Sequence, residues 1–384
     1  MTLIKSISGI RGTIGGRPYE NLTPLDTVIY VSAFASWLKS NFLNIQPKVV
    51  VGRDARISGP MIQSLVNQTF VAYGIDVFDL GLSTTPTVEI SVIELKAQAG
   101  IIITASHNPK DWNALKFIDS NGEILSSKSV ADILKIADDR DFNYVGIDYM
   151  GKVSPVEAMM ERHIEKILGL SLVQSDAIKK KGFRVVLDAV NSTGGIVVPQ
   201  LLEALGVDVV PLYCDPNGLF PHNPEPLKEH LSVLCQKVVE VKADFGIVVD
   251  PDVDRLAFVD ETGEMFGEEY TLVSCADYVL THSPGNTVSN LSSTRALADV
   301  TTSKGGVYFT SAVGELNVVE KMKAENAVIG GEGNGGIIYP ELHYGRDALV
   351  GIALFLSLLV EKEMKVSALK ASYPKYAMSK AKVA

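Results

Sequence analysis

This chain of 384 residues has little cysteine and fewer basic than acidic residues. The three cysteines, Cys214, Cys235 and Cys275, are far apart and form no C-x-x-C pair. Their spacing excludes a disulfide framework and a cysteine-rich zinc site, and it suits a reducing compartment. With 35 Lys and Arg against 45 Asp and Glu, the net charge of −10 argues against broad nucleic-acid binding. An anionic ligand would therefore need locally clustered Arg and Lys.

The sequence also lacks a long hydrophobic run. The longest, 348–360, has 13 residues and includes Gly351 and Ser357. It is too short to span a bilayer, so it predicts a buried helix. The first six residues show no apolar signal core. We expect a cytoplasmic protein, a monomer or a homodimer, that binds neither nucleic acid nor membrane.

What the chain does contain is a polar turn, 104–109, directly after the apolar run 100–103. The run predicts a buried strand, and the turn would present the Ser106 hydroxyl at the end of that strand, where open α/β sheets usually place ligands. No G-x-S-x-G elbow surrounds Ser106, so a hydrolase triad lacks support. His107 follows it directly, and adjacent side chains usually point apart. Ser106 alone is a weak signal, because most loop serines satisfy turns.

A second polar turn, 250–255, follows the apolar strand predicted at 245–249. It carries Asp250, Asp252 and Asp254, and alternate carboxylates in a tight loop can converge on one cation. All-oxygen ligation with open positions suits Mg²⁺. An EF-hand is excluded, because Arg255 stands at the sixth position, where that loop needs glycine. A serine and a cation site together indicate phosphoryl transfer, with a solvated acidic turn as the alternative.

The order strand, polar turn, helix, glycine stop and strand occurs three times, at 49–78, 185–210 and 288–309. This alternation predicts α/β domains with mixed or parallel sheets. We expect three similar α/β domains with mixed sheets around a central cleft. Their predicted extents are 1–146, with the serine turn; 147–255, with the aspartate turn; and 256–376, with a glycine-rich turn.

The glycine-rich turn 331–336 formally fits G-x-G-x-x-G. It fails as a dinucleotide fingerprint, because Ile337–Pro340 follows it rather than a helix. We interpret it as a close-approach loop in which Glu332 and Asn334 bind ligand hydroxyls, with a plain glycine turn as the alternative.

Six basic residues lie on or near these turns or on two further predicted loops, 9–12 and 53–59. Arg suits bidentate phosphate binding, although each cation taken singly could be a surface charge. Lys116 interrupts an apolar strand, so burial could lower its pKa and fit it for proton transfer. The six are Arg11, Arg53, Arg56, Lys110, Lys116 and Arg255.

These motifs together resemble the α-D-phosphohexomutases, the family of phosphoglucomutase, phosphomannomutase and phosphoglucosamine mutase. The matching stretches occur in the family's order and cover nearly the whole chain. They are Gly9–Gly12, Gly52–Asp54, Thr104–Pro109, Asp250–Arg255 and Gly330–Glu332.

The resemblance implies that Ser106 is the phosphoserine and that Mg²⁺ binds it together with Asp250, Asp252 and Asp254. It implies that Arg11 and Lys116 assist proton transfer and that Arg255 lies beside the phosphoserine. We place Glu332, Asn334 and His107 among the substrate-binding residues. The implied reaction moves phosphate between O1 and O6 of a hexose through a sugar bisphosphate.

Two departures from the family pattern stand out. The family's sugar loop commonly ends Ser-Gly-His, whereas this chain has Asn334-Gly335-Gly336, a variant that resembles archaeal-type members. The family normally has a fourth domain with a Ser-Gly-Thr loop, and no such loop occurs before this sequence ends. We expect 377–384 to begin the linker to that domain.

The leading hypothesis is therefore a hexose-phosphate mutase, with phosphoglucosamine mutase preferred over phosphomannomutase or phosphoglucomutase. One alternative is a non-catalytic module that binds sugar phosphates. Another is a Mg²⁺-dependent phosphatase, which would share the aspartate turn but not require the glycine-rich loop.

Overall fold

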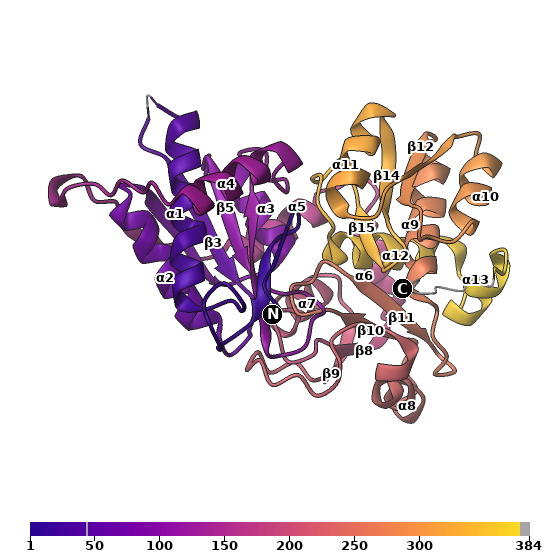
Figure 1. Ribbon diagram of the computed structural model, residues 1–384. Helices are drawn as coiled ribbons and strands as arrows, with labels where there is room; N and C mark the ends of the chain where they lie inside the picture. The colour runs from indigo at the N-terminus through magenta and orange to yellow at the C-terminus, as the bar shows by residue number, and fades with distance from the viewer. Residues whose placement is uncertain (44, 377–384) are drawn as a thin grey trace.

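The computed structural model describes residues 1–43 and 45–376, and it forms three α/β units, each built on its own sheet (Figure 1). Each sheet contains both parallel and antiparallel strand pairs, so the predicted fold class of three α/β domains with mixed sheets is confirmed. The predicted linker 377–384 lies outside the described residues. No helix in the described ranges is long and apolar enough to cross a membrane.

Unit I has a seven-stranded sheet in the order β1-β2-β6-β5-β3-β4-β7. Helices α1, α2 and α4 cover one face, and α3 packs on the other against Val50, Ile102 and Ile118. The strands are β1 (Ile4–Ser6), β2 (Gly9–Thr13), β3 (Lys48–Arg53), β4 (Asp76–Leu82), β5 (Ala99–Ile103), β6 (Trp112–Ile118) and β7 (Val153–Pro155). The helices are α1 (Pro24–Asn41), α2 (Gly59–Ala72), α3 (Thr85–Glu94), α4 (Ser127–Asp139) and the 3-10 turn Ile147–Tyr149.

Unit II has a four-stranded sheet in the order β11-β10-β8-β9. Helix α8 packs on one face of it, and the other face belongs to a larger core. Its strands are β8 (Arg184–Asp188), β9 (Asp208–Leu212), β10 (Phe245–Val249) and β11 (Leu256–Asp260). Its helices are α5 (Met159–Leu168), α6 (Ser175–Lys181), α7 (Gly194–Ala204), α8 (Ser232–Glu240) and the 3-10 turn Lys228–His230.

Unit III has a four-stranded sheet in the order β13-β12-β14-β15. Its strands are β12 (Asn286–Asn290), β13 (Tyr308–Ser311), β14 (Ala327–Glu332) and β15 (Gly336–Ile338). Its helices are α9 (Glu268–His282), α10 (Ala296–Ser303), α11 (Glu315–Ala324), α12 (Ala348–Lys362) and α13 (Val366–Ser372).

Two strands lie across the boundaries predicted from the sequence. β7, expected in the second segment, pairs with β4 in the first sheet. β11, expected to open the third segment, pairs antiparallel with β10 in the second sheet. The chain reverses at the aspartate turn and returns along the strand that it has just left, so a boundary at 255 would cut a hairpin.

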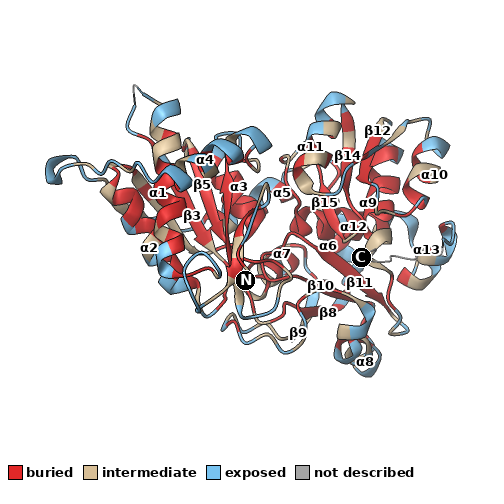
Figure 2. Cartoon of the chain, viewed as in Figure 1, coloured by how far each residue is buried: buried red, intermediate tan, exposed pale blue. Residues whose placement is uncertain are grey.

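The core of units II and III is continuous. Helix α12 is buried on almost every side (Figure 2) and belongs to a cluster that includes Phe245 and Phe258 of unit II. Stacked rings of Phe258 and Phe355, with centroids 3.8 Å apart, join α12 to the second sheet. The longest apolar run of the sequence is therefore covered by the protein core of units II and III. This packing also fixes the turn before α12, which carries part of the site.

Candidate active site at the junction of the three units

The serine turn follows β5, whose five residues are all buried. Ser106 has a left-handed backbone conformation, with φ of 49°, which is uncommon for a residue with a side chain. Its amide donates to Thr104 Oγ1 at 2.9 Å. Left-handed residues held by their surroundings occur often at functional sites, and here the conformation exposes the hydroxyl at the end of the strand.

Arg56 holds this turn from beneath. Its guanidinium donates to the carbonyl oxygens of Ser106, Asn108, Pro109 and Trp112, and it pairs with Asp54 at 3.0 Å. The sequence suggested Arg56 as one of several possible phosphate ligands. It is instead fully buried, and its donors bind the serine turn and Asp54. Arg53 likewise donates its Nε to Gln63, 2.8 Å away. Both arginines stabilise the loops of unit I.

The aspartate turn meets the serine turn directly. Ser106 Oγ donates to Asp250 Oδ2 at 2.6 Å, and the other oxygen of Asp250 accepts the amides of Asp254 and Arg255. All three aspartates are fully buried, and one oxygen from each lies within 4.8 Å of the others. The β-branched Val253 between them has a φ of 63°, which marks a strained turn.

The aspartate oxygens are unequally satisfied. Asp252 Oδ2 accepts Thr85 Oγ1 at 2.6 Å and Lys116 Nζ at 2.7 Å, and Asp254 Oδ2 accepts Arg346 Nη2 at 2.6 Å. Asp252 Oδ1 and Asp254 Oδ1 are buried and accept no hydrogen bond in the described part of the chain, although Asp254 Oδ1 lies 4.0 Å from Arg255 Nε. Unpaired buried carboxylate oxygens are costly, so this set fits a hard divalent cation.

The electrostatics of the aspartate turn indicate the same need. Burial and the neighbouring charges of Asp252 and Asp254 raise the pKa of Asp250 well above its ordinary value. Burial alone would also raise the pKa of Asp252, but the ion pair with Lys116 and the Thr85 hydrogen bond lower it below its ordinary value. A cation between the three carboxylates would relieve their mutual repulsion.

Lys116, on β6, differs from the sequence expectation. Its Nζ lies 2.7 Å from Asp252 Oδ2 and 3.5 Å from Asp254 Oδ2. Burial acts to lower the pKa of Lys116, but the two aspartates raise it above its ordinary value. The expected lowering of the lysine pKa is therefore wrong for this arrangement, because sequence could not show the two facing carboxylates.

Three further predicted residues surround Ser106. His107 Nδ1 lies 3.5 Å from Ser106 Oγ, and burial, Arg255 and Arg346 lower the pKa of His107 to about 3, which keeps it neutral. Arg255 Nη1 reaches Glu225 at 3.3 Å. The buried Nε atoms of Arg11 and Arg255 have no hydrogen-bond acceptor among the residues described. These donors are available to an anion.

On the opposite side, the glycine-rich turn begins at Glu332, the last residue of β14. Its carboxylate accepts Asn290 Nδ2 at 2.7 Å, the Gly314 amide at 3.1 Å and Arg346 Nη1 at 2.8 Å. Burial would raise the pKa of Glu332, but Arg346 and Asn290 lower it, so this carboxylate is ionised. Asn334 receives the Gly336 amide at 3.2 Å on its side-chain oxygen.

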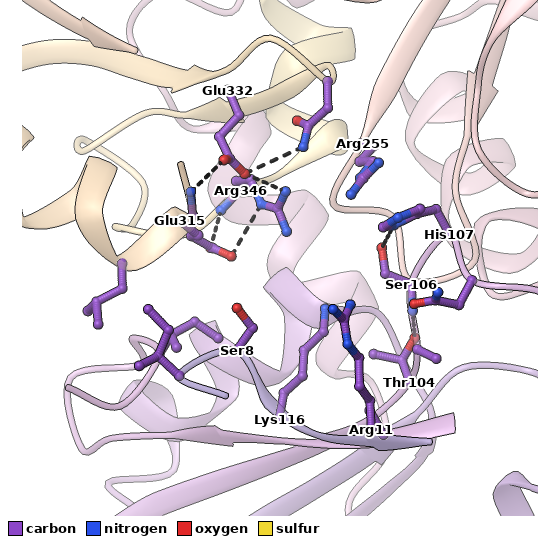
Figure 3. Close-up of a pocket in the computed structure, with 18 of the residues that line it drawn as sticks. Ser8, Arg11, Thr104, Ser106, His107, Lys116, Arg255, Glu315, Glu332 and Arg346 are labelled. Carbon is purple, nitrogen blue, oxygen red and sulfur yellow. Dashed lines mark hydrogen bonds and ion pairs between the residues drawn. The ribbon is translucent and has the colours of Figure 1, made fainter. Parts of the chain in front are cut away.

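These residues line one cavity of about 280 Å³ between units I and III (Figure 3). Lys116 and Arg11 extend into it from the first sheet, and Glu332, Arg346 and Glu315 lie opposite (Figure 3). Of the residues predicted for the site, Arg11, Ser106, His107, Lys116, Arg255, Glu332 and Asn334 all line it. The three aspartates lie directly behind Ser106 and Lys116.

Sequence reasoning missed Arg346 and Glu315. Arg346 pairs with three carboxylates, and Glu315 accepts its Nε at 3.2 Å. One signal could have found Arg346: the stretch Gly345–Ala348 repeats the Gly-Arg-Asp-Ala of Gly52–Ala55. Glu315, at the start of α11, gives no comparable signal in the sequence.

Models of three consecutive domains match this chain. They are described as phosphoglucomutase/phosphomannomutase alpha/beta/alpha domain I, at residues 3–144, domain II, at 161–263, and domain III, at 267–376. The chain belongs to the phosphoglucomutase/phosphomannomutase family. The matched domain II contains β11, in agreement with the hairpin that places this strand in the second sheet.

Curated relatives carry names from across this phosphohexomutase family. A phosphoglucomutase/phosphomannomutase of Thermococcus kodakarensis is 34% identical over 97% of this chain and 81% of its own length. A probable phosphoglucosamine mutase of Methanopyrus kandleri is 34% identical over 96% and 78%. A solved family protein of Burkholderia thailandensis superposes with a TM-score of 0.85 at 26% identity, over 98% of this chain and 81% of that one. The family's enzymes are intramolecular phosphotransferases, and the recognition from sequence is confirmed.

Proposed function

We propose that this phosphohexomutase interconverts hexose 1-phosphates and hexose 6-phosphates through a phosphoserine at Ser106 and a sugar bisphosphate, with glucosamine phosphates preferred. The observation that carries the proposal is the hydrogen bond from Ser106 Oγ to Asp250, beside two carboxylate oxygens that accept no hydrogen bond in the described ranges. A serine oxygen in contact with a cation-ready carboxylate cluster suits retention and transfer of a phosphoryl group. Relatives named for both hexose and glucosamine phosphates support the substrate class.

In this proposal Asp250, Asp252 and Asp254 hold Mg²⁺, which would neutralise charge on the transferring phosphoryl group. The phosphorus–oxygen bond to Ser106 breaks and a new one forms to a sugar hydroxyl, so the serine oxygen gains a proton and the hydroxyl loses one. Lys116 is charged beside its aspartates, and in this proposal it gives its proton to the serine oxygen and regains one from the hydroxyl. Arg11 and Arg255 contribute the unpaired donors that a phosphate would accept.

The sugar would lie against the opposite wall. Glu332 is ionised and rigidly held, which suits a hydrogen-bond acceptor for ring hydroxyls. Asn334 and the neutral imidazole of His107 supply further polar contacts along the same cavity. A phosphatase would need no such wall, and this is the feature that favours mutase chemistry over hydrolysis.

The test is a panel of glucosamine, glucose and mannose 1-phosphates with Mg²⁺ and a trace of sugar bisphosphate. We expect conversion to 6-phosphates without release of free phosphate, fastest for glucosamine phosphate. Intact mass should show one phosphate on the wild type and none on Ser106→Ala, which should lose at least about a thousandfold in turnover. Stoichiometric release of phosphate would favour the phosphatase hypothesis. Binding of sugar phosphate without turnover would favour the hypothesis of a non-catalytic binding module. Unimpaired Ser106→Ala would refute the proposed mechanism.

A further inference from the structure

We propose that Arg346 is a positioning residue that fixes the sugar-reading carboxylate of Glu332 relative to the cation-facing Asp254, and that position 336 is glycine to make room for it. The inference rests on the proposed function, since it concerns the same cavity. It assigns a role to a residue that the motifs of the sequence did not include.

The guanidinium of Arg346 divides its donors among three carboxylates on three different segments. Nη1 reaches Glu332 Oε2 at 2.8 Å, Nη2 reaches Asp254 Oδ2 at 2.6 Å, and Nε reaches Glu315 Oε2 at 3.2 Å. The Arg346 amide also donates to Glu315 Oε1 at 3.0 Å. Only a planar fork with several donors can serve three acceptors in fixed directions, which a lysine cannot reproduce.

The contact with Asp254 determines which oxygen remains free. Arg346 donates to Oδ2, and Oδ1 is left buried without a hydrogen bond among the residues described, 4.0 Å from Arg255 Nε. On the other side, the contact with Glu332 holds one carboxylate oxygen, while Asn290 and Gly314 hold the second. Arg346 thus joins the cation side of the cavity to its sugar side through one rigid group.

Gly336 is the steric partner of Arg346. A Cβ built at position 336 would lie 2.4 Å from Arg346 Cδ and 3.1 Å from its Cγ, closer than such atoms approach. No side chain at 336 can therefore coexist with Arg346 in its present position. Gly336 and Arg346 therefore form a matched pair, in which the arginine side chain occupies the volume that a larger residue at 336 would need.

A purely structural role is the competing explanation, because Arg346 directly precedes the N-cap of α12. Sugar preference separates the two, since a residue that only supports the helix would not set it. We expect Arg346→Lys, which keeps the charge but not the fork, to stay folded. Its kcat/KM should fall at least tenfold, and its preference among glucosamine, glucose and mannose phosphates should flatten as in Glu332→Gln. An unchanged sugar ranking in Arg346→Lys would overturn the positioning role.

The steric pairing is tested by a double-mutant cycle with melting temperature as a second readout. Gly336→Ala should lower the melting temperature and turnover in the wild-type background. In Arg346→Ala the same change should cost almost nothing further. Gly146→Ala is the control, because a Cβ at that glycine meets no atom within 4 Å. Additive costs would overturn the pairing. A wild type that turns over no hexose phosphate would refute the proposed function instead, and the melting cycle would still decide the pairing. If Arg346→Ala does not fold, the sugar ranking of Arg346→Lys decides the proposal.

Discussion

Within residues 1–43 and 45–376, two buried clusters have the spacing of a metal site, and one of them is suited to bind a cation. The aspartate cluster comprises Asp250, Asp252 and Asp254, and the histidine cluster comprises His163, His343 and Asp347. In both, the possible ligand atoms lie within 4.8 Å of one another, and all six residues are buried. Distance and burial therefore do not distinguish the two clusters.

The difference lies in which lone pairs are already used. In the histidine cluster, Asp347 Oδ2 receives His163 Nε2 at 2.9 Å and His343 Nε2 at 3.3 Å, and its Oδ1 caps α12 through the Leu349 amide at 2.8 Å. His163 Nδ1 lies 3.0 Å from Thr87 Oγ1. In the aspartate cluster, Asp252 Oδ1 and Asp254 Oδ1 accept no hydrogen bond in the described ranges, and the same two carboxylates contact the cavity-lining Lys116 through their other oxygens. A cation site needs ligand atoms that folding has left unsatisfied.

The histidine cluster instead joins the three units. Thr87 belongs to α3 of unit I, His163 to α5 of unit II, and Asp347 to the turn before α12 of unit III. His343 Nδ1 has no hydrogen bond in the described ranges, but the bonds of His163 and Asp347 link all three units. Buried hydrogen bonds of this kind help to specify how units pack. The comparison favours the proposed catalytic role for the aspartate cluster and a role in assembling the fold for the histidine cluster, and substitutions can separate these roles.

The largest expected effect is that of Asp252→Asn on turnover. Losing one carboxylate should weaken Mg²⁺ binding and lower kcat by at least about a hundredfold. The unfolding free energy should change much less, because Asn keeps the shape of the side chain and removes one of three mutually repelling buried carboxylates. Calorimetric Mg²⁺ titration and urea unfolding measure the two effects separately. Turnover and titration equal to wild type would show that the aspartate cluster holds no catalytic cation.

Asp347→Ala should show the reverse pattern. It removes the cap of α12 and leaves two buried imidazoles without their acceptor, so the unfolding free energy should fall by about 3 kcal/mol or more. Mg²⁺ affinity of the remaining folded protein should stay near wild type. Urea unfolding followed by titration at low temperature checks both. If Asp347→Ala bound Mg²⁺ more weakly than Asp252→Asn does, the two clusters would have to act together in cation binding.

These two clusters also show what sequence could and could not predict. Ser106 and the aspartates were predictable because each follows directly on an apolar strand, a local pattern that gave the fold class as well. The ion pair of Asp254 with Arg346 joins residues 92 apart, and the bond of His163 with Asp347 joins residues 184 apart. No local pattern contains such contacts. The same limit put β7 and β11 in the wrong segments, since strand pairing is a property of the folded sheet.

A smaller effect is expected for Glu332→Gln. The amide keeps the shape of the side chain but loses the charge that Arg346 and Asn290 hold in place. A hydroxyl-reading site that loses one buried partner loses about 1–3 kcal/mol of discrimination. The ratio of kcat/KM values for glucose and mannose phosphates should move toward one, measured against Glu320→Ala, an exposed residue on α11, as control. An unchanged ratio would place specificity elsewhere.

The smallest effect concerns Glu89, which borders the histidine cluster from α3. Its carboxylate is fully buried, and His343 Nδ1 lies 3.4 Å from Oε2 without a hydrogen bond between them. Burial and the charge of Glu315 raise the pKa of Glu89 well above its ordinary value of 4.5. For Asp347 the direction is opposite: burial acts to raise its pKa, but the two histidines lower it below the ordinary value.

The two carboxylates should therefore change the unfolding free energy with pH in opposite directions. A group whose pKa is raised in the folded state contributes stability below its ordinary pKa, here 4.5, and this stability is lost as the pH rises. The unfolding free energy of Glu89→Gln should therefore increase relative to wild type between pH 4.5 and 8, by about 1 kcal/mol. A lowered folded pKa gives stability that is present above the ordinary value of 3.8 and lost in acid, so the deficit of Asp347→Ala should shrink below that pH. Melting temperatures measured from below pH 3.8 up to pH 8 give both slopes. If Glu89→Gln instead lost stability as the pH rose, Glu89 would be ionised and paired with a protonated His343. The histidine cluster would then carry a buried ion pair between units I and III, in place of the neutral contact inferred here.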